Sequence, residues 1–114
     1  MDQVRFTLKA KIWLHKGGKA AWHFITLRKK ESAAIAKHNG IVKHGWGSVK
    51  VTARLGESVW STSIFPDRAS GTYLLPLKAS VRKKEGLNEG DMVTFTLEIN
   101  MYNRPAPKKK GTQY

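Results

Sequence analysis

Residues 60–66 read Trp60-Ser61-Thr62-Ser63-Ile64-Phe65-Pro66, and they open the stretch up to Phe95 that decides the fold. A glycine-containing turn follows, and then a second short strand is expected over residues 72–77. A basic helix is predicted from about Ala79 to Glu85, with Gly86 after it, and Gly90-Asp91 forms a tight turn before a last strand. Strand, turn, strand, helix, turn and strand with short connections indicate a small domain built mainly from β-strands.

The chain before this stretch carries the same kind of pattern. Residues 4–15 alternate apolar and polar side chains. Because successive side chains of a strand point to opposite faces, this alternation predicts a long strand with one buried face. Gly17-Gly18 suits a hairpin turn, since glycine adopts positive φ without strain. We therefore expect a hairpin that returns over residues 20–27.

A helix and a second hairpin are expected next. Residues 29–39 predict a short helix that ends at Gly40. Residues 48–55 and 59–65 predict a pair of strands, the second ended by Pro66, because proline cannot donate to a strand ladder. Residues 92–102 predict the last strand, with alternate apolar residues facing the core.

Six or seven short strands need protected edges, which favours a closed barrel over an open sheet. The fold class is therefore predicted to be mainly β, a small barrel capped by two short helices. Leu27-Arg28-Lys29 before the first helix echoes Leu77-Lys78-Ala79 before the second, which suggests two similar halves. The barrel domain is expected over residues 1–103, and residues 104–114 are expected to form a basic, disordered tail that can bury nothing.

Composition limits the class of protein. The 114 residues suit one domain, and the lack of cysteine excludes disulfides, thiolate metal sites and cysteine nucleophiles. The N-terminus lacks the order of a signal peptide, and no apolar run approaches the ~20 residues of a membrane helix. We therefore expect a cytoplasmic protein without a membrane association, and the sequence leaves the oligomeric state open, with a monomer slightly favoured.

The net charge of +13 is the strongest functional signal. The last eleven residues supply four of these charges, so the barrel itself carries +9. A field of this size attracts nucleic acid or other polyanions, although it can also serve solubility alone. The candidate polyanion-binding residues are Arg5, Lys9, Lys11, Lys50, Arg54, Arg82, Lys83 and Lys84. If the first and third strands were neighbours, the first five of these residues would form one positive stripe.

The four tryptophans suggest a second class of function. Trp22, Trp46 and Trp60 could line a pocket for a small ring-shaped ligand, in a binding protein or an unrecognised enzyme. Alternatively they close the ends of the barrel, which is the commoner role of large aromatic residues in a small core. Trp13 falls on the polar face of its strand, where it is covered by a helix or exposed. A protein-interaction domain is a third interpretation, for which the sequence has no signature.

No catalytic or metal-binding constellation is recognisable. Ser61 and Ser63 share a strand face that His23 could approach, but no third group completes a catalytic set. The four histidines, His15, His23, His38 and His44, do not pair at ligand spacings, and no carboxylate or cysteine completes a site. We therefore expect no metal, no cofactor and no catalysis.

The sequence resembles the domain-of-unknown-function family nineteen-oh-five over about residues 6–100. The resemblance is carried by residues 22–25 (WHFI), 46–51 (WGSVKV), 60–66 (WSTSIFP), 71–77 (GTYLLPL), 81–83 (VRK) and 90–93 (GDMV). Arg28 departs from it, because the family usually has proline there. The resemblance implies a double-split barrel similar in plan to the swapped-hairpin domain of AbrB-type transcription regulators, here with both halves in one chain. It implies no catalytic residue, since no activity is established for the family.

Overall fold

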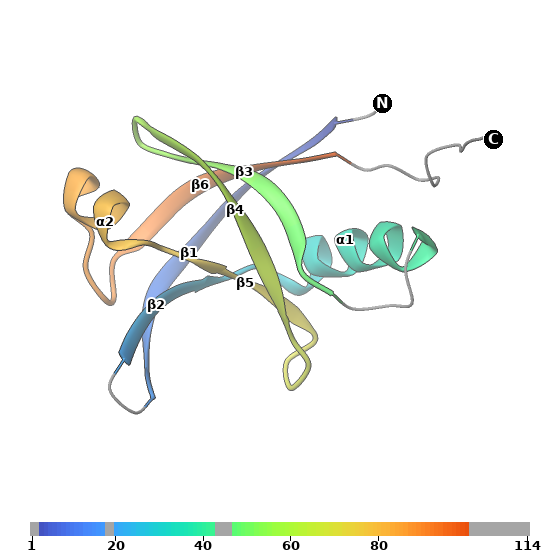
Figure 1. Cartoon of the computed structure of the whole chain (residues 1–114), viewed down its shortest axis with the longest axis horizontal. Helices are drawn as coiled ribbons and strands as arrows, with labels where there is room; N and C mark the ends of the chain where they lie inside the picture. The colour runs from blue at the N-terminus through green and yellow to red at the C-terminus, as the bar shows by residue number, and fades with distance from the viewer. Residues whose placement is uncertain (1–2, 18–19, 43–46, 101–114) are drawn as a thin grey trace.

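The computed structural model describes residues 3–17, 20–42 and 47–100 of the chain (Figure 1). Six strands and two helices follow one another along these residues. The elements are β1 (Gln3–Gly17), β2 (Ala20–Thr26), α1 (Lys29–Val42), β3 (Val49–Leu55), β4 (Ser58–Asp67), β5 (Thr72–Pro76), α2 (Ala79–Glu85) and β6 (Met92–Asn100). The prediction of a mainly β barrel with two helices is confirmed.

The strands close into a barrel in the order β1-β2-β5-β4-β3-β6, with every described pair antiparallel. Exchanging the first half of the chain (β1, β2, α1, β3) for the second (β4, β5, α2, β6) leaves this order unchanged. The junctions agree with this symmetry: Leu27 N–H donates to the Tyr73 carbonyl and Leu77 N–H to the His23 carbonyl, both at 2.9 Å. The echo between the two halves of the sequence is thus present in the topology.

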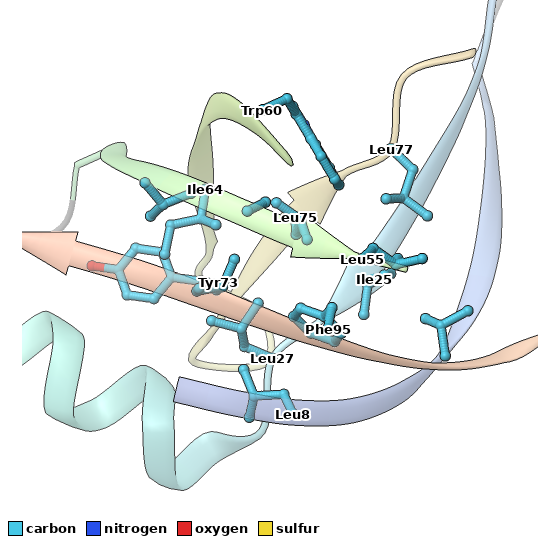
Figure 2. Packing of buried hydrophobic residues seen from close by; sticks show 14 of the residues in the cluster. Leu8, Ile25, Leu27, Leu55, Trp60, Ile64, Tyr73, Leu75, Leu77 and Phe95 are labelled. Atoms are coloured by element: carbon cyan, nitrogen blue, oxygen red, sulfur yellow. The ribbon is translucent and has the colours of Figure 1, made fainter. Parts of the chain in front are cut away.

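The inward residues of all six strands fill the barrel (Figure 2). Phe95 and Leu97 of β6, Leu75 of β5 and Ile25 of β2 are almost completely buried. Their positions follow the alternation in the sequence: along each strand, alternate side chains point into the core and the others point to the outer surface. Outward residues are therefore free to differ in chemistry from one part of the barrel to another.

The helices lie on opposite sides of the barrel (Figure 1). Ile35 of α1 is buried in the core, and the Ser32 hydroxyl accepts the Tyr73 N–H at 3.0 Å. On the other side, Val81 of α2 is buried and the Glu85 carboxylate accepts the Ser58 hydroxyl at 2.7 Å. Each helix is thus attached to the barrel by a buried apolar side chain and by side-chain hydrogen bonding.

The turn between β3 and β4 shows why one glycine is required. Gly56 has a φ of 62°, in the left-handed region, and a Cβ there would collide with the Glu85 carboxylate. The carboxylate also accepts the Glu57 N–H at 3.2 Å, so it lies directly against the turn. Glycine at this position lets α2 approach the β3–β4 hairpin.

Two residues that were predicted to end an element do not end it. Helix α1 continues through Gly40, because glycine permits a helix end without imposing one and is tolerated inside a helix at a cost of about 1 kcal/mol. Strand β4 continues through Pro66, which lies opposite Tyr73. Among the described residues, the pairing of β3 with β4 stops at Ile64, so the missing N–H of Pro66 costs no bond in the described β3–β4 ladder.

Candidate functional site

The outward residues of β1, β6 and β3 form a surface rich in cations and hydroxyl groups, which we call the basic face. The sequence analysis expected one continuous positive stripe if β1 and β3 were neighbouring strands. They are not neighbours, because β6 lies between them. Arg5 lies opposite Glu98, which lies opposite Thr52 on β3. The cations of β1 and β3 are therefore two strand spacings apart, about 10 Å. The basic face comprises Arg5, Thr7, Lys9 and Lys11 of β1, Thr94, Thr96 and Glu98 of β6, and Lys50, Thr52 and Arg54 of β3.

Glu98 joins the two arginines across β6. Its Oε2 accepts the Arg5 Nη2 at 2.8 Å and the Arg54 Nε at 3.1 Å. The glutamate is only 7% exposed, whereas the side chains of Arg5 and Arg54 are 65% and 49% exposed. Desolvation of Glu98 raises its pKa, but the hydrogen bonds and charges of Arg54 and Arg5 together outweigh this and hold the pKa below its usual value. Glu98 therefore stays ionised and fixes the two guanidinium groups, which still face solvent.

The lysines of the basic face are exposed, and in the described part of the chain they form no ion pair. Among the described residues, the ion pairs shorter than 4.0 Å include none at Lys9, Lys11 or Lys50. Lys9 lies opposite Thr94 and Lys11 opposite Met92, so no acid faces either of them across the β1–β6 ladder. Within the described part of this surface, five cations are balanced by one carboxylate.

The cations of α2 lie apart from the basic face. Arg82 lies next to His23, and its Nε donates to the Leu77 carbonyl at 3.2 Å. Lys83 and Lys84 are exposed on the same helix, which packs against β4. The predicted set of eight bases thus divides into five on the basic face and three on α2.

The tryptophans do not line one pocket together. Trp60 is 8% exposed and belongs to the core, where it points into the barrel (Figure 2). Trp22 is 55% exposed on the outer side of β2, because its strand turns the alternate residues His23 and Ile25 toward the interior. Trp46 lies outside the described residues. The prediction that Trp22 and Trp60 line the same pocket is therefore wrong, since the barrel wall separates their rings.

Trp22 instead belongs to a group of rings on the outer side of the β1–β2 hairpin, which we call the aromatic surface (Trp13, His15, Trp22 and Phe24). The centroids of Trp22 and Phe24 are 6.4 Å apart with nearly parallel planes, and those of Trp13 and Phe24 are 5.3 Å apart. His15 meets Trp13 edge-on at 6.3 Å. The sequence placed Trp13 on an outward face but missed its partner Phe24, because both faces of β2 are apolar.

A groove of about 420 Å³ borders the aromatic surface at the start of α2. It is lined by Trp22, His23, Leu77, Lys78, Arg82 and two alanines. Burial lowers the pKa of His23, the charge of Arg82 lowers it further, and Glu89 opposes them. His23 is therefore held neutral beside two cationic side chains, and Lys78 joins the cations that sequence reasoning identified.

The hydroxyl and histidine candidates are dispersed. Ser61 and Ser63 lie outward on β4, whereas His23 is on β2, and β5 lies between these strands. Within residues 3–17, 20–42 and 47–100, no three histidine, cysteine or acidic side chains gather as metal ligands would. His44 and the side chain of His38 lie outside the described residues. No catalytic constellation is assembled by the described residues.

Comparison with known proteins identifies a family whose function is unknown. The family model described as "Domain of unknown function (DUF1905)" matches residues 8–97, which is most of the chain. No curated protein matches the sequence. Neither helix in the described part of the chain is both long and apolar enough to cross a membrane.

Proposed function

The chain belongs to the DUF1905 family, and we propose that this member binds polyanions, specifically the phosphate backbone of nucleic acid, through the basic face. The observation that carries the proposal is the charge arrangement on β1, β6 and β3. Within the described residues, Lys9, Lys11 and Lys50 are exposed and form no ion pair. The Arg5 and Arg54 side chains also face solvent, although each is hydrogen-bonded to Glu98. Solvent-facing guanidinium groups and ammonium groups both suit phosphate oxygens.

The hydroxyl groups of the same surface support this function. Thr7 and Thr96 lie opposite each other, and their hydroxyls are 3.3 Å apart. Thr94 and Thr52 add two more hydroxyls between the cations. Threonine side chains and cations together are the groups that hold a phosphate backbone in register without reading its bases. The basic face therefore favours binding that depends on charge and salt and not on base sequence.

We also propose a more specific type of barrel. The exchange symmetry of the strand order supports a double-split barrel related in plan to AbrB-type domains, with both halves in one chain. The proposal includes a cytoplasmic location. Nucleic acid is abundant there, and the lack of cysteine in the chain suits a compartment in which disulfides are rare.

Fluorescence anisotropy with a labelled DNA duplex at several salt concentrations tests this function. Each lysine that contacts a phosphate contributes about −0.9 to the slope of log affinity against log salt, so Lys9→Gln with Lys11→Gln is expected to reduce the slope by about 1.8. Lys83→Gln with Lys84→Gln is the matched control, because it removes the same charge from exposed positions on α2.

Two results would count against the proposal. An absence of binding at low salt, with protein at about tens of micromolar, would exclude a nucleic-acid function, because non-specific contacts alone give affinities in that range. An equal loss in the two double variants would show that only the net charge matters. In that case the basic face would have no special role.

A further inference from the structure

The outer row of β1 changes from cations to rings. Its successive outward residues are Arg5, Thr7, Lys9, Lys11, Trp13 and His15, and all except the half-buried Trp13 are exposed. Neighbours in such a row are about 7 Å apart. The basic face therefore continues directly into the aromatic surface along one strand, without an intervening acidic residue on that row.

The rings of the aromatic surface are held in defined positions. The Trp13 Nε1–H donates to the Thr26 hydroxyl at 2.8 Å, which fixes the indole against β2. Phe24 lies between Trp13 and Trp22, and the planes of Phe24 and Trp22 differ by only 14°. Trp22 ends the series with more than half of its surface in solvent. A flat, exposed indole supported from behind by a second ring offers a platform on which another ring can stack.

Cations flank this platform on both sides. Lys11 precedes Trp13 on β1, and Lys78 and Arg82 line the groove that Trp22 shares. The nearby acids are Glu89, whose charge reaches His23, and Asp91, whose carboxylate accepts the Asn88 N–H at 2.8 Å. A ligand that lies across the aromatic surface would thus meet positive charge at both ends.

We propose that the aromatic surface stacks unpaired bases, so that the chain prefers single-stranded nucleic acid over duplex. The inference rests on the proposed binding of the phosphate backbone to the basic face. A duplex covers the flat faces of its bases by stacking within the helix, whereas a single strand can present them to side chains. A protein partner would also cover exposed rings, but the continuous row of cations on β1 and the cations of the groove favour a ligand with both phosphates and rings.

Three labelled probes of equal length separate stacking from charge. They are a thymine single strand, an abasic single strand and a duplex, each titrated by anisotropy at low salt. The wild-type chain is expected to bind the thymine strand about 5- to 150-fold more tightly than the abasic strand for each base stacked. Trp22→Ala is expected to abolish most of that ratio and leave duplex affinity unchanged, and Trp22→Phe to retain part of it.

Val59→Ala is the matched control, because Val59 is also exposed, at 52%, but carries no ring and lies beside Arg54. Circular dichroism of each variant checks that the barrel is intact. Equal affinity for the thymine and abasic strands would overturn the stacking inference, as would a thymine-to-abasic affinity ratio that Trp22→Ala leaves unchanged. Either result would favour a protein partner for the aromatic surface, whereas duplex binding would still support the basic face. Failure of all three probes to bind would overturn the proposed function as well.

Discussion

The basic face and the aromatic surface share strand β1 but are held in place by different forces. On the basic face, the buried carboxylate of Glu98 positions two arginines through charged hydrogen bonds. On the aromatic surface, ring contacts and one indole hydrogen bond position the side chains. The difference arises from the neighbouring strands, since the first part of β1 pairs with β6 and the last part with β2. Two chemically distinct surfaces can therefore be changed separately while the inward residues keep the barrel closed.

Loss of a core side chain should damage both surfaces at once. Phe95 is 1% exposed on β6, directly beneath the basic face. Phe95→Ala leaves a cavity, and the free energy of unfolding is expected to fall by about 3–5 kcal/mol in denaturant titrations. Both surfaces should weaken together when the barrel unfolds. Thr94→Ala, at the exposed neighbouring position, is the control and should change the free energy of unfolding by no more than about 0.5 kcal/mol. A similar loss in both variants would contradict the central packing role of Phe95.

A change at Glu98 should act on the basic face alone. Glu98→Gln removes the one carboxylate of this face and frees Arg5 and Arg54, so affinity for duplex DNA is expected to rise. Each arginine that gains a phosphate should steepen the salt slope by about 0.9. Thermal unfolding should show a lower midpoint, because the charged hydrogen bonds are lost. Salt-dependent anisotropy measures the first effect.

Glu31→Gln is the matched control for this experiment. Glu31 also pairs with an arginine, Arg28, at 2.6 Å, but it lies on α1 and away from the basic face. The same loss of one negative charge there should leave the salt slope unchanged. A weaker affinity in Glu98→Gln would mean that Glu98 orients the arginines for phosphate and does more than compete for them.

Much of the fold follows from local pattern in the sequence. The period-two alternation correctly placed Arg5, Lys9, Lys11, Lys50 and Arg54 on outward faces, because side-chain direction within a strand depends only on that strand. The order of strands does not have this property. It depends on pairing between segments far apart in the chain, so the position of β6 between β1 and β3 could not be read from β1 or β3. For the same reason the sequence offered no signal for the role of Glu98.

The aromatic surface shows a different limit. The sequence analysis grouped Trp22 with Trp60, but Trp22 is exposed and the Trp60 ring lies inside the barrel. The apolar residues on both sides of β2 hid which face was the inner one. A usable signal was present on the partner strand, where Trp13 and His15 continue the outward row that begins at Arg5. In a hairpin, the clear alternation of one strand identifies the faces of the other through the register.

The stability contributions of His23 and Glu98 should be lost at different pH, with smaller changes than those above. The pKa of His23, beside the aromatic surface, is lowered from 6.5, because burial, aided by Arg82 and opposed by Glu89, disfavours its charged form. As pH falls below 6.5, the unfolded chain therefore takes up a proton before the folded one, and stability declines until the lower folded pKa is passed. The pKa of Glu98 on the basic face is lowered from 4.5, so its stabilising contribution is complete above that pH and is lost as pH falls through the folded pKa. Unfolding midpoints measured from pH 7 downward should thus show two declines. His23→Gln should flatten the first. Glu98→Gln should reduce the second, to which Glu31 also contributes because the Arg28 hydrogen bond lowers its pKa. One decline removed by both variants would mean that the two surfaces titrate as a single unit.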